Sequence, residues 1–122
     1  KNFNVREFAC HHCGENEIEQ KVINLCQKIR DFVGTPIKIN SGYRCPVHNK
    51  KVGGVPNSYH VQGLASDLYY VFGAKNLFIA IRSLYDLGVI PELSFCYLYR
   101  KENFVHIDCG QYRKNGVFQI HD

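Results

Sequence analysis

The sequence lacks any long apolar run. No stretch of about 18 apolar residues occurs among its 122 residues, so we expect no membrane-spanning helix. The opening KNFNVREF does not have the pattern of a signal peptide, which leaves open a leader or a further domain outside the sequence. Internal repeats and low-complexity segments are also missing. With 45% hydrophobic residues, the chain has enough apolar side chains for one core, and we expect residues 1–122 to form a single domain.

Positive charge is present but is not concentrated in one place. The 15 Lys and Arg residues exceed the 11 Asp and Glu residues, giving a net charge of +4. A nucleic-acid-binding domain would more often carry a continuous basic stripe or a recognition motif. We therefore expect no nucleic-acid partner, whereas mild basicity suits a polyanionic substrate.

Hydrophobic periodicity predicts an α+β fold. Apolar residues recur at three- and four-residue steps over residues 16–33 and 74–87, as in amphipathic helices, and a glycine follows each stretch. Alternating or mainly apolar stretches predict four strands, over residues 36–40, 64–71, 94–99 and 104–109. This order of elements indicates a mainly antiparallel sheet with two packed helices.

Two segments of this pattern matter for function. Residues 41–63 have no periodicity and are rich in Gly and Pro, which indicates a long ordered loop or a short helix between turns; such loops are often functional. Residues 100–103 join the last two strands as a hairpin. Alternation along that hairpin places His106 and Asp108 on one face with Tyr97 and Tyr99, opposite the apolar face.

The six cysteines allow more than one interpretation. An even count permits disulfides, although a chain of this length can fold on its core alone. Cys10-x-x-Cys13 and Cys45-x-x-His48 together form a set that suits a closed tetrahedral zinc site, which would hold the N-terminal segment against the loop. Either His11 or His12 is an alternative to His48, and free or disulfide-linked thiols are the alternative to the metal.

The remaining cysteines lie on predicted apolar faces. We expect these three to be small buried residues, and a disulfide within the hairpin is not expected: Cys26, Cys96 and Cys109.

Three residues are candidates for a catalytic metal site. His60 ends the loop, Asp67 lies in the strand that follows, and His106 lies in the last predicted strand. Two imidazoles and one carboxylate are a catalytic zinc shell that leaves a position for water, whose pKa zinc lowers to about 7. The residues alone leave another interpretation open, because a strand histidine usually packs or hydrogen-bonds and an aspartate often caps a turn.

Three sequence elements resemble one family. SYHVQGLASD at residues 58–67 is similar to the S-x-H-x-x-G-x-A-x-D signature of the M15-type zinc peptidases, which include D-alanyl-D-alanine carboxypeptidases and dipeptidases and phage L-alanyl-D-glutamate endolysins. SGYR at residues 41–44 resembles the family's S-G-Y-R element, and FVHID at 104–108 its closing zinc strand. The resemblance covers roughly residues 3–110. The signalling domain of Hedgehog proteins, which is not known chiefly as a peptidase, shares this zinc fold.

The resemblance implies roles for individual residues. It implies His60, Asp67 and His106 as ligands of one catalytic Zn²⁺. It implies that Arg44 binds a substrate carboxylate, a role for which a planar guanidinium making two charge-assisted bonds is suited; taken alone, Arg44 fits a structural ion pair as well. Ser58 is expected to hydrogen-bond the substrate or to orient the loop.

Small and aromatic residues near these ligands also receive expectations. Gly63 and Ala65 are expected to be small so that the backbone can approach the metal. Tyr43 and Tyr59 are expected either to form aromatic walls that contact the substrate or to pack in the core.

The catalytic base is where the sequence departs from the family. Many relatives have Glu or Asp three residues before the last zinc histidine, whereas this chain has Asn103, which cannot take a proton. We expect Asp108 to be the base or to hold the attacking water, with Glu102 and then Glu92 as alternatives. A further alternative is that Asp108 only orients a histidine ligand.

The resemblance implies zinc-dependent hydrolysis of amide bonds in peptidoglycan stem peptides. We expect a D-alanyl-D-alanine carboxypeptidase. The alternatives are an L-alanyl-D-glutamate endopeptidase of the phage-endolysin type and a non-catalytic, zinc-stabilised, Hedgehog-like binding module. The expected partner is the stem peptide of the bacterial cell wall, and we expect the protein to be a monomer. We expect it to reach the wall either as a secreted or periplasmic protein or by release from the cytoplasm as a phage-type lysin.

Overall fold

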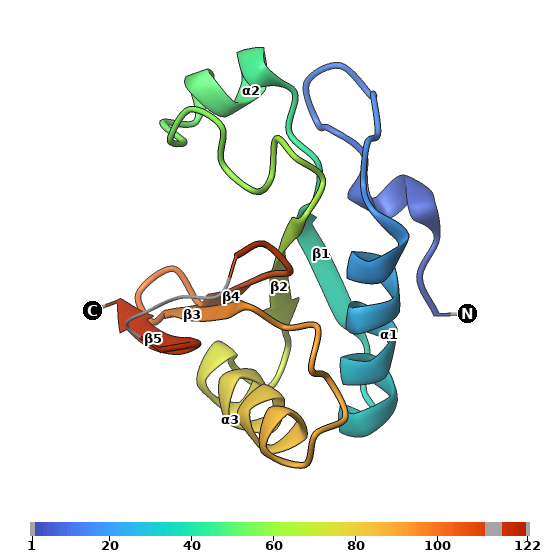
Figure 1. Ribbon diagram of the computed structural model, residues 1–122, viewed down its shortest axis with the longest axis vertical. Helices are drawn as coiled ribbons and strands as arrows, with labels where there is room; N and C mark the ends of the chain where they lie inside the picture. Colours follow the sequence, from blue (N-terminus) through green and yellow to red (C-terminus); the bar gives the residue numbers. More distant parts are fainter. Residues whose placement is uncertain (1, 112–115, 122) are drawn as a thin grey trace.

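The fold is a mixed α+β arrangement, as the sequence predicts. A computed structural model describes residues 2–111 and 116–121, and its ribbon is drawn in Figure 1. Its elements in chain order are η1 (Val5–Phe8), α1 (Gln20–Val33), β1 (Ile37–Ser41), α2 (Pro46–Lys51), β2 (Ala65–Tyr70), α3 (Ala74–Asp86), β3 (Phe95–Tyr99), β4 (Phe104–Asp108) and β5 (Phe118–His121). Within the described ranges, no helix is both long and apolar enough to cross a membrane.

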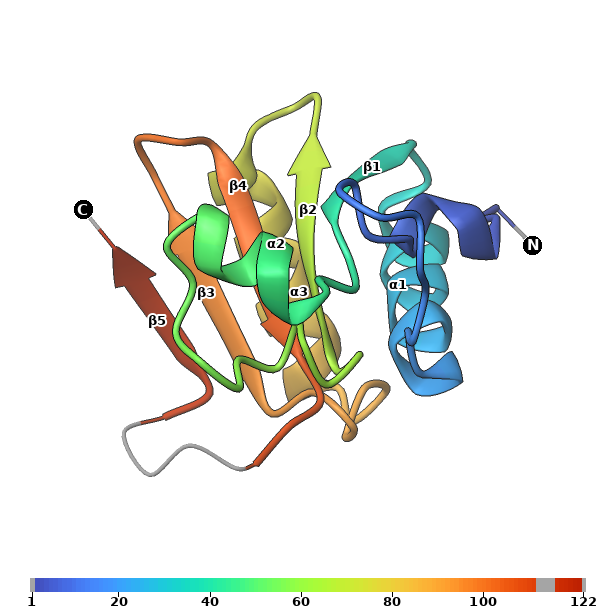
Figure 2. The ribbon, with the colours of Figure 1, turned by 90° about the horizontal axis from the view of Figure 1, so that it is seen from above.

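One five-stranded sheet organises the chain. Its order is β1-β2-β4-β3-β5, and all neighbours are antiparallel except the β3–β5 pair, which is parallel. The strand β5 was not expected from the sequence, because a four-residue edge strand that pairs in parallel with a distant segment has no local turn signal. Figure 2 shows α2 on one side of this sheet and α3 on the other.

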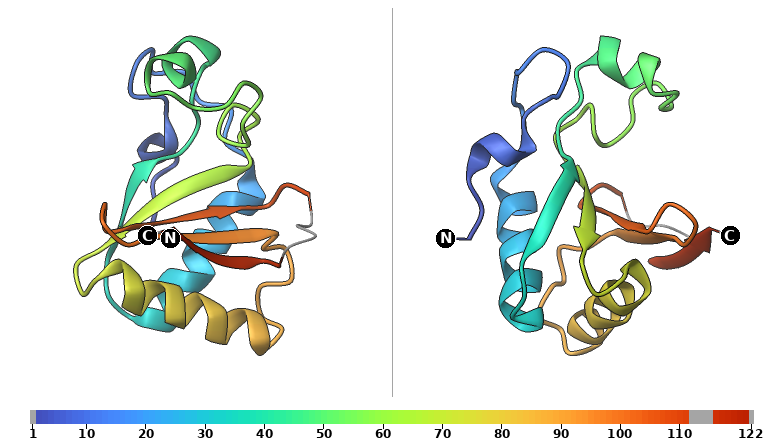
Figure 3. Two further views of the ribbon diagram at one scale, coloured as in Figure 1. Left: turned by 90° about the vertical axis from the view of Figure 1, so that its left-hand side faces the viewer. Right: turned by 180° about the vertical axis from the view of Figure 1, so that it is seen from behind.

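The two long helices cover the apolar face. The alternation of each strand sends Leu68, Val105 and Ile107 into the core, where they are fully buried with Leu25 of α1 and Leu77 of α3. Figure 3 shows α1 beside β1 and α3 along the underside of the sheet. Burial of one such side chain contributes about 1.5–3 kcal/mol, so this face holds the sheet in place. The opposite face is left for polar side chains.

The first long helix begins later than its apolar pattern predicts. Asn16 donates its side-chain amide to the carbonyl of Val5 at 2.8 Å and accepts the amide of Ile18 at 3.1 Å. The amide of Glu19 donates to the carbonyl of Gly63 at 2.9 Å. Because residues 16–19 bond to other segments, the helix starts only at Gln20.

The region predicted as a loop or short helix contains the six-residue helix α2. Cys45 caps its N-terminus by accepting the amide of His48 at its sulfur, and Pro46 occupies the first turn, where a missing N–H costs nothing. Asn49, almost fully buried, donates its side-chain amide to the carbonyl of Val55 at 2.8 Å. The amide of Arg44 donates to the carbonyl of His60 at 3.1 Å, so the two ends of the loop lie together over the sheet.

Candidate metal centre and substrate cavity

Three residues that are distant in sequence meet on the polar face of the sheet. Asp67 of β2 and His106 of β4 are direct cross-strand partners, and His60 reaches them from the end of the loop. The ligand atoms of these three residues lie within 4.8 Å of one another. Asp67 Oδ1 is 3.0 Å from His106 Nδ1 and 3.3 Å from His60 Nε2. The predicted ligand set is therefore brought together.

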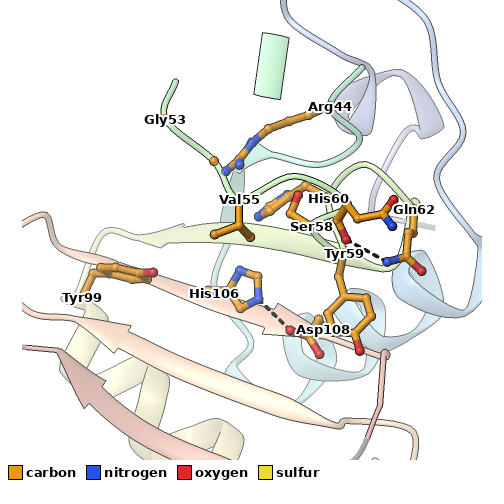
Figure 4. A pocket seen from close by; sticks show the side chains of 12 residues that line it. Arg44, Gly53, Val55, Ser58, Tyr59, His60, Gln62, Tyr99, His106 and Asp108 are labelled. Carbon is orange, nitrogen blue, oxygen red and sulfur yellow. Dashed lines mark hydrogen bonds and ion pairs between the residues drawn. The ribbon is translucent and has the colours of Figure 1, made fainter. Parts of the chain in front are cut away.

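The far nitrogen of each imidazole already has a partner. His60 Nδ1 donates to the carbonyl oxygen of Gly42 at 2.8 Å, and His106 Nε2 donates to Asp108 Oδ2 at 2.8 Å, the dashed contact in Figure 4. A carbonyl and a carboxylate accept these protons, which directs His60 Nε2 and His106 Nδ1 toward Asp67. Such outer partners fix ring orientation in zinc proteins. Two oriented imidazoles and a carboxylate fit a Zn²⁺ ion.

The same contacts set the charge of the cluster. Burial favours the neutral carboxyl of Asp67, but the charge of His60 and the hydrogen bond with His106 outweigh it and hold the pKa of Asp67 well below its usual range. Burial also favours neutral His106, yet its hydrogen bonds with Asp108 and Asp67 raise the pKa of His106 to about 9. Without metal, the centre therefore holds a protonated histidine between two carboxylates.

Arg44 lies at the edge of this centre. Its Nη2 is 3.3 Å from Asp67 Oδ2, its Nη1 donates to Asn49 Oδ1 at 3.2 Å, and its Nε donates to Ser41 Oγ at 3.3 Å. Ser58 also donates to Asn49 Oδ1, at 3.2 Å. Asn49 thus fixes both Arg44 and Ser58, a role that sequence reasoning missed because an asparagine in an aperiodic segment carries no distinguishing signal.

A cavity of about 550 Å³ opens beside the candidate metal ligands. Figure 4 shows its side chains converging from the loop on one side and from the sheet on the other. They include Arg44, Ser58, Tyr59, His60, His106 and Asp108. Tyr59 forms one wall and its hydroxyl accepts the amide of Gln111 at 3.0 Å.

The structure decides between the two alternatives for Tyr43 and corrects the expectation for Gly63. Tyr43 is not among the residues that line it; Tyr43 is buried with Cys10 and Cys45 in a separate small cluster. Gly63 has φ of 73°, and a Cβ there would meet the carbonyl oxygen of Glu17. Gly63 is therefore required by the segment before α1 rather than by close approach to a metal.

Asn103, at the family's usual base position, and the three candidate proton acceptors occupy very different places. Asn103 has φ of 60° and its Oδ1 accepts the amide of Ala74 at 2.9 Å, so it supports the start of α3. Glu92 pairs with Lys28 at 3.0 Å, and Glu102 is exposed on the hairpin; neither is among the cavity-lining residues. Asp108 lines the cavity.

The environment of Asp108 favours one of the roles left open by the sequence. Its side chain is fully buried, with Oδ2 bound to His106 Nε2 at 2.8 Å. The amide of Gly110 donates to its Oδ1 at 3.3 Å. Because both oxygens have protein partners, this arrangement favours a carboxylate that orients a ligand.

A second group of potential ligands lies at the N-terminal segment. The sulfur atoms of Cys10, Cys13 and Cys45 all lie within 4.8 Å of one another. No described cysteine forms a disulfide, and Cys26, Cys96 and Cys109 are buried as expected. Burial would raise the pKa of Cys10, but backbone amides, that of Cys45 first, lower it to about 7. These three cysteines therefore form a second candidate metal-binding group.

The chain matches a known protein family over most of its length. The family model described as Peptidase M15 matches residues 1–108. No curated protein matches the chain. The matched range contains all the residues of both candidate metal groups and ends at Asp108.

Proposed function

Because this chain belongs to the M15 peptidase family, which implies metallopeptidase activity, we propose that it is a zinc peptidase of peptidoglycan stem peptides and acts as a D-alanyl-D-alanine carboxypeptidase. The observation that carries this proposal is the position of Arg44. Its guanidinium lies 3.3 Å from a carboxylate oxygen of Asp67 and lines the same cavity as His60 and His106. A fixed positive charge therefore stands immediately beside the proposed zinc ligands.

His60, Asp67 and His106 would hold the zinc ion. When bound there, zinc supplies a Lewis acid that polarises a scissile carbonyl and activates water near neutral pH. The protein prepares its donors in advance, because the bonds to Gly42 and Asp108 already orient the two imidazoles.

Arg44 would position the substrate. Asn49, Ser41 and Asp67 accept bonds from its Nη1, Nε and Nη2, which limits the conformations of the guanidinium and leaves one further N–H on each Nη atom for a substrate carboxylate. A carboxylate bound at Arg44 places the neighbouring amide bond close to the metal ligands. Such positioning converts binding energy into a productive orientation of the reacting groups.

The distance between charge and metal ligands limits the substrate class. The bond cleaved must lie next to a residue that carries a free carboxylate. The C-terminal residue of a D-alanyl-D-alanine peptide meets this condition, and the cavity of about 550 Å³ has room for it. The D-glutamate of an L-alanyl-D-glutamate bond carries a free carboxylate as well, so the endopeptidase is the second candidate.

Asp108 would act through His106. Its carboxylate holds the Nε2 proton of the ring and so presents Nδ1 toward Asp67. We therefore propose that Asp108 is a positioning residue; a direct role as the base is the competing prediction.

The decisive experiment is product analysis by mass spectrometry. Purified zinc-loaded protein is incubated with muropeptides that carry pentapeptide stems. Loss of one D-alanine supports the carboxypeptidase, whereas cleavage after L-alanine assigns the endopeptidase instead. The variant His60→Ala should form no product, and the matched variant His11→Ala, on the exposed N-terminal segment, should retain activity. No product at any zinc concentration would contradict the enzyme and leave a zinc-stabilised binding module.

A further inference from the structure

Three thiols from two distant segments meet outside the substrate cavity. Cys10 and Cys13 come from the turn after η1, and Cys45 comes from the loop that enters α2; their sulfur atoms lie within 4.8 Å of one another. Cys10 and Cys45 are buried and Cys13 is exposed. Figure 1 shows the N-terminal turn and α2 side by side at the top of the molecule. None of the three lines the cavity beside His60.

Backbone amides converge on these sulfur atoms. The amide of Cys45 donates to Cys10 Sγ at 3.4 Å, and the amide of His48 donates to Cys45 Sγ at 3.4 Å. The turn that brings Cys13 back is closed by a bond of 2.9 Å from the amide of Gly14 to the carbonyl of Cys10. Gly14 has φ of 76°, which suits glycine. Amide donors of this kind stabilise thiolates, which are the form that binds metals.

His12 lies outside the group whose ligand atoms are all within 4.8 Å of one another, but one of its nitrogens is next to a thiol of that group, which makes it the candidate for the fourth ligand. His12 Nδ1 lies 3.7 Å from Cys45 Sγ. With Zn–S of about 2.3 Å and Zn–N of about 2.0 Å, two ligand atoms of a tetrahedral zinc site are separated by about 3.6 Å. The ring of His48 stacks on His12, with centroids 6.0 Å apart, and within the described residues the His48 ring forms no hydrogen bond with a sulfur.

We propose that Cys10, Cys13, Cys45 and His12 bind a structural zinc ion that is separate from the His60 centre. Three thiolates and one imidazole fill a tetrahedral shell, leaving no position for substrate. A disulfide explains the cluster less well, because pairing any two of three neighbouring thiols leaves the third unused. Softer thiolate ligands also select zinc over the hard cations Mg²⁺ and Ca²⁺.

The site joins the N-terminal segment to the loop that carries Arg44. The two segments already meet through a 2.8 Å bond from the amide of Tyr43 to the carbonyl of Phe8, and a Cβ at Gly42 would overlap Phe8. Cys45 directly follows Arg44 in the chain. Zinc bound at Cys45 would therefore restrain residues 42–45 and limit the movement of the Arg44 backbone.

The first test counts metal ions. Purified wild-type protein should contain two zinc ions per chain by elemental analysis, and Cys13→Ser and His60→Ala should each contain one. Cys13 is exposed, so its replacement should not disturb the core. The double variant should contain none. Two ions retained in Cys13→Ser, or a single ion in the wild type that is lost in His60→Ala, would overturn the proposal.

A second measurement uses the unaltered wild-type protein and so does not depend on the folding of a variant. Titration with a mercurial reagent that blocks thiolates should release one zinc ion per chain, detected with a chromogenic chelator, while the second stays bound until stronger chelation. Release of no zinc by the mercurial would contradict thiolate ligation. The His60 centre contains no thiol, so the mercurial reagent should not release its zinc. Absence of zinc from the His60 centre and absence of zinc from the cysteine site therefore give different results.

The fourth ligand is assigned by comparing neighbouring histidines. Cobalt-substituted His12→Ala should lose the tetrahedral absorption pattern and bind zinc at least tenfold more weakly, while the matched variants His11→Ala and His48→Ala keep both properties. The same loss in His48→Ala, with His12→Ala unchanged, would transfer the assignment to His48 and overturn that of His12.

Discussion

Asp67 and His106 face each other across strands β2 and β4, and Asp67 Oδ1 lies 3.0 Å from His106 Nδ1. Arg44 Nη2 lies 3.3 Å from the other oxygen of the same carboxylate. One buried anion therefore connects the proposed zinc ligands to the proposed substrate-binding guanidinium.

Replacing Asp67 by Asn should destabilise the metal-free protein. The change removes the anion but leaves Arg44 and a protonated His106 partly buried without it. Breaking a buried ion pair in this way costs about 3–5 kcal/mol. Urea unfolding in the presence of EDTA at pH 6 measures the effect.

The matched control for this variant is Asp86→Asn. Asp86 pairs with Arg82 at 3.7 Å on the exposed surface of α3, so its loss should change the free energy of unfolding by less than about 1 kcal/mol. Equal effects of the two substitutions would show that the Asp67 cluster does not stabilise the fold.

The stability of the metal-free protein should fall as the pH rises from about 6.5 to 9. The pKa of His106 is raised to about 9 in the folded state, above the usual value of about 6.5 for an unfolded chain. The folded state therefore binds the proton more tightly, so this contribution is complete below pH 6.5 and is lost as the pH passes 9. The measurement is the urea midpoint in EDTA from pH 6 to pH 10, compared with His106→Gln, which should lack this decline.

Zinc binding should be coupled to the same proton. A histidine must be deprotonated to bind a metal, so adding zinc to metal-free protein at pH 7 should release a proton from His106. A pH indicator in weakly buffered solution measures this release. The experiment uses the Cys13→Ser variant to isolate the His60 centre. In the wild-type protein, zinc binding at the cysteine site would also release protons, from its thiols. No proton release in that variant would contradict a protonated His106.

The helices and strands in which apolar residues recur at a regular spacing could be predicted from the sequence. Apolar side chains at helical spacing located α1 and α3, and alternation located the β3–β4 hairpin with the register that places His106 and Asp108 on one face. These features depend on local backbone geometry, which a short window of sequence records.

The predictions that were wrong or incomplete concern features that depend on contacts between distant segments. Bonds from Asn16 and Glu19 to other parts of the chain delay the start of α1, and β5 exists only by pairing with β3. The role of Asn49 likewise requires that α2 fold over the sheet. No local pattern encodes these contacts, and the small size of Gly63 was assigned to the wrong neighbour for the same reason.

Replacing Asp108 by Asn separates its two predicted roles. If it orients His106, the loss of charge should weaken zinc binding about 10- to 100-fold, and saturating zinc should restore most of kcat. If it is the base, zinc should stay bound and kcat should fall about 10²- to 10⁴-fold at any zinc concentration. We expect the first result, because Asp108 Oδ2 already accepts a hydrogen bond from His106 Nε2 at 2.8 Å.

The control for the base is Glu102→Gln. Glu102 is exposed and does not line the cavity, so this variant should keep zinc affinity and kcat. A large loss of kcat in Glu102→Gln, with Asp108→Asn little changed, would instead identify Glu102 as the proton acceptor.

Asn49→Ala should weaken substrate use without removing zinc. Among the described residues the asparagine side chain hydrogen-bonds to no proposed zinc ligand, but its Oδ1 accepts bonds from Arg44 Nη1 and Ser58 Oγ at 3.2 Å each. Without it the guanidinium would occupy more conformations, and a charge-assisted bond is worth about 1.5–3 kcal/mol. We expect kcat/KM to fall about 10- to 100-fold, mainly through KM, with zinc content unchanged.

Arg44→Lys should show a loss at least as large, because an ammonium cannot make the paired bonds of a guanidinium. If Asn49→Ala kept full activity on a substrate that Arg44→Lys no longer used, the position of Arg44 would not depend on Asn49.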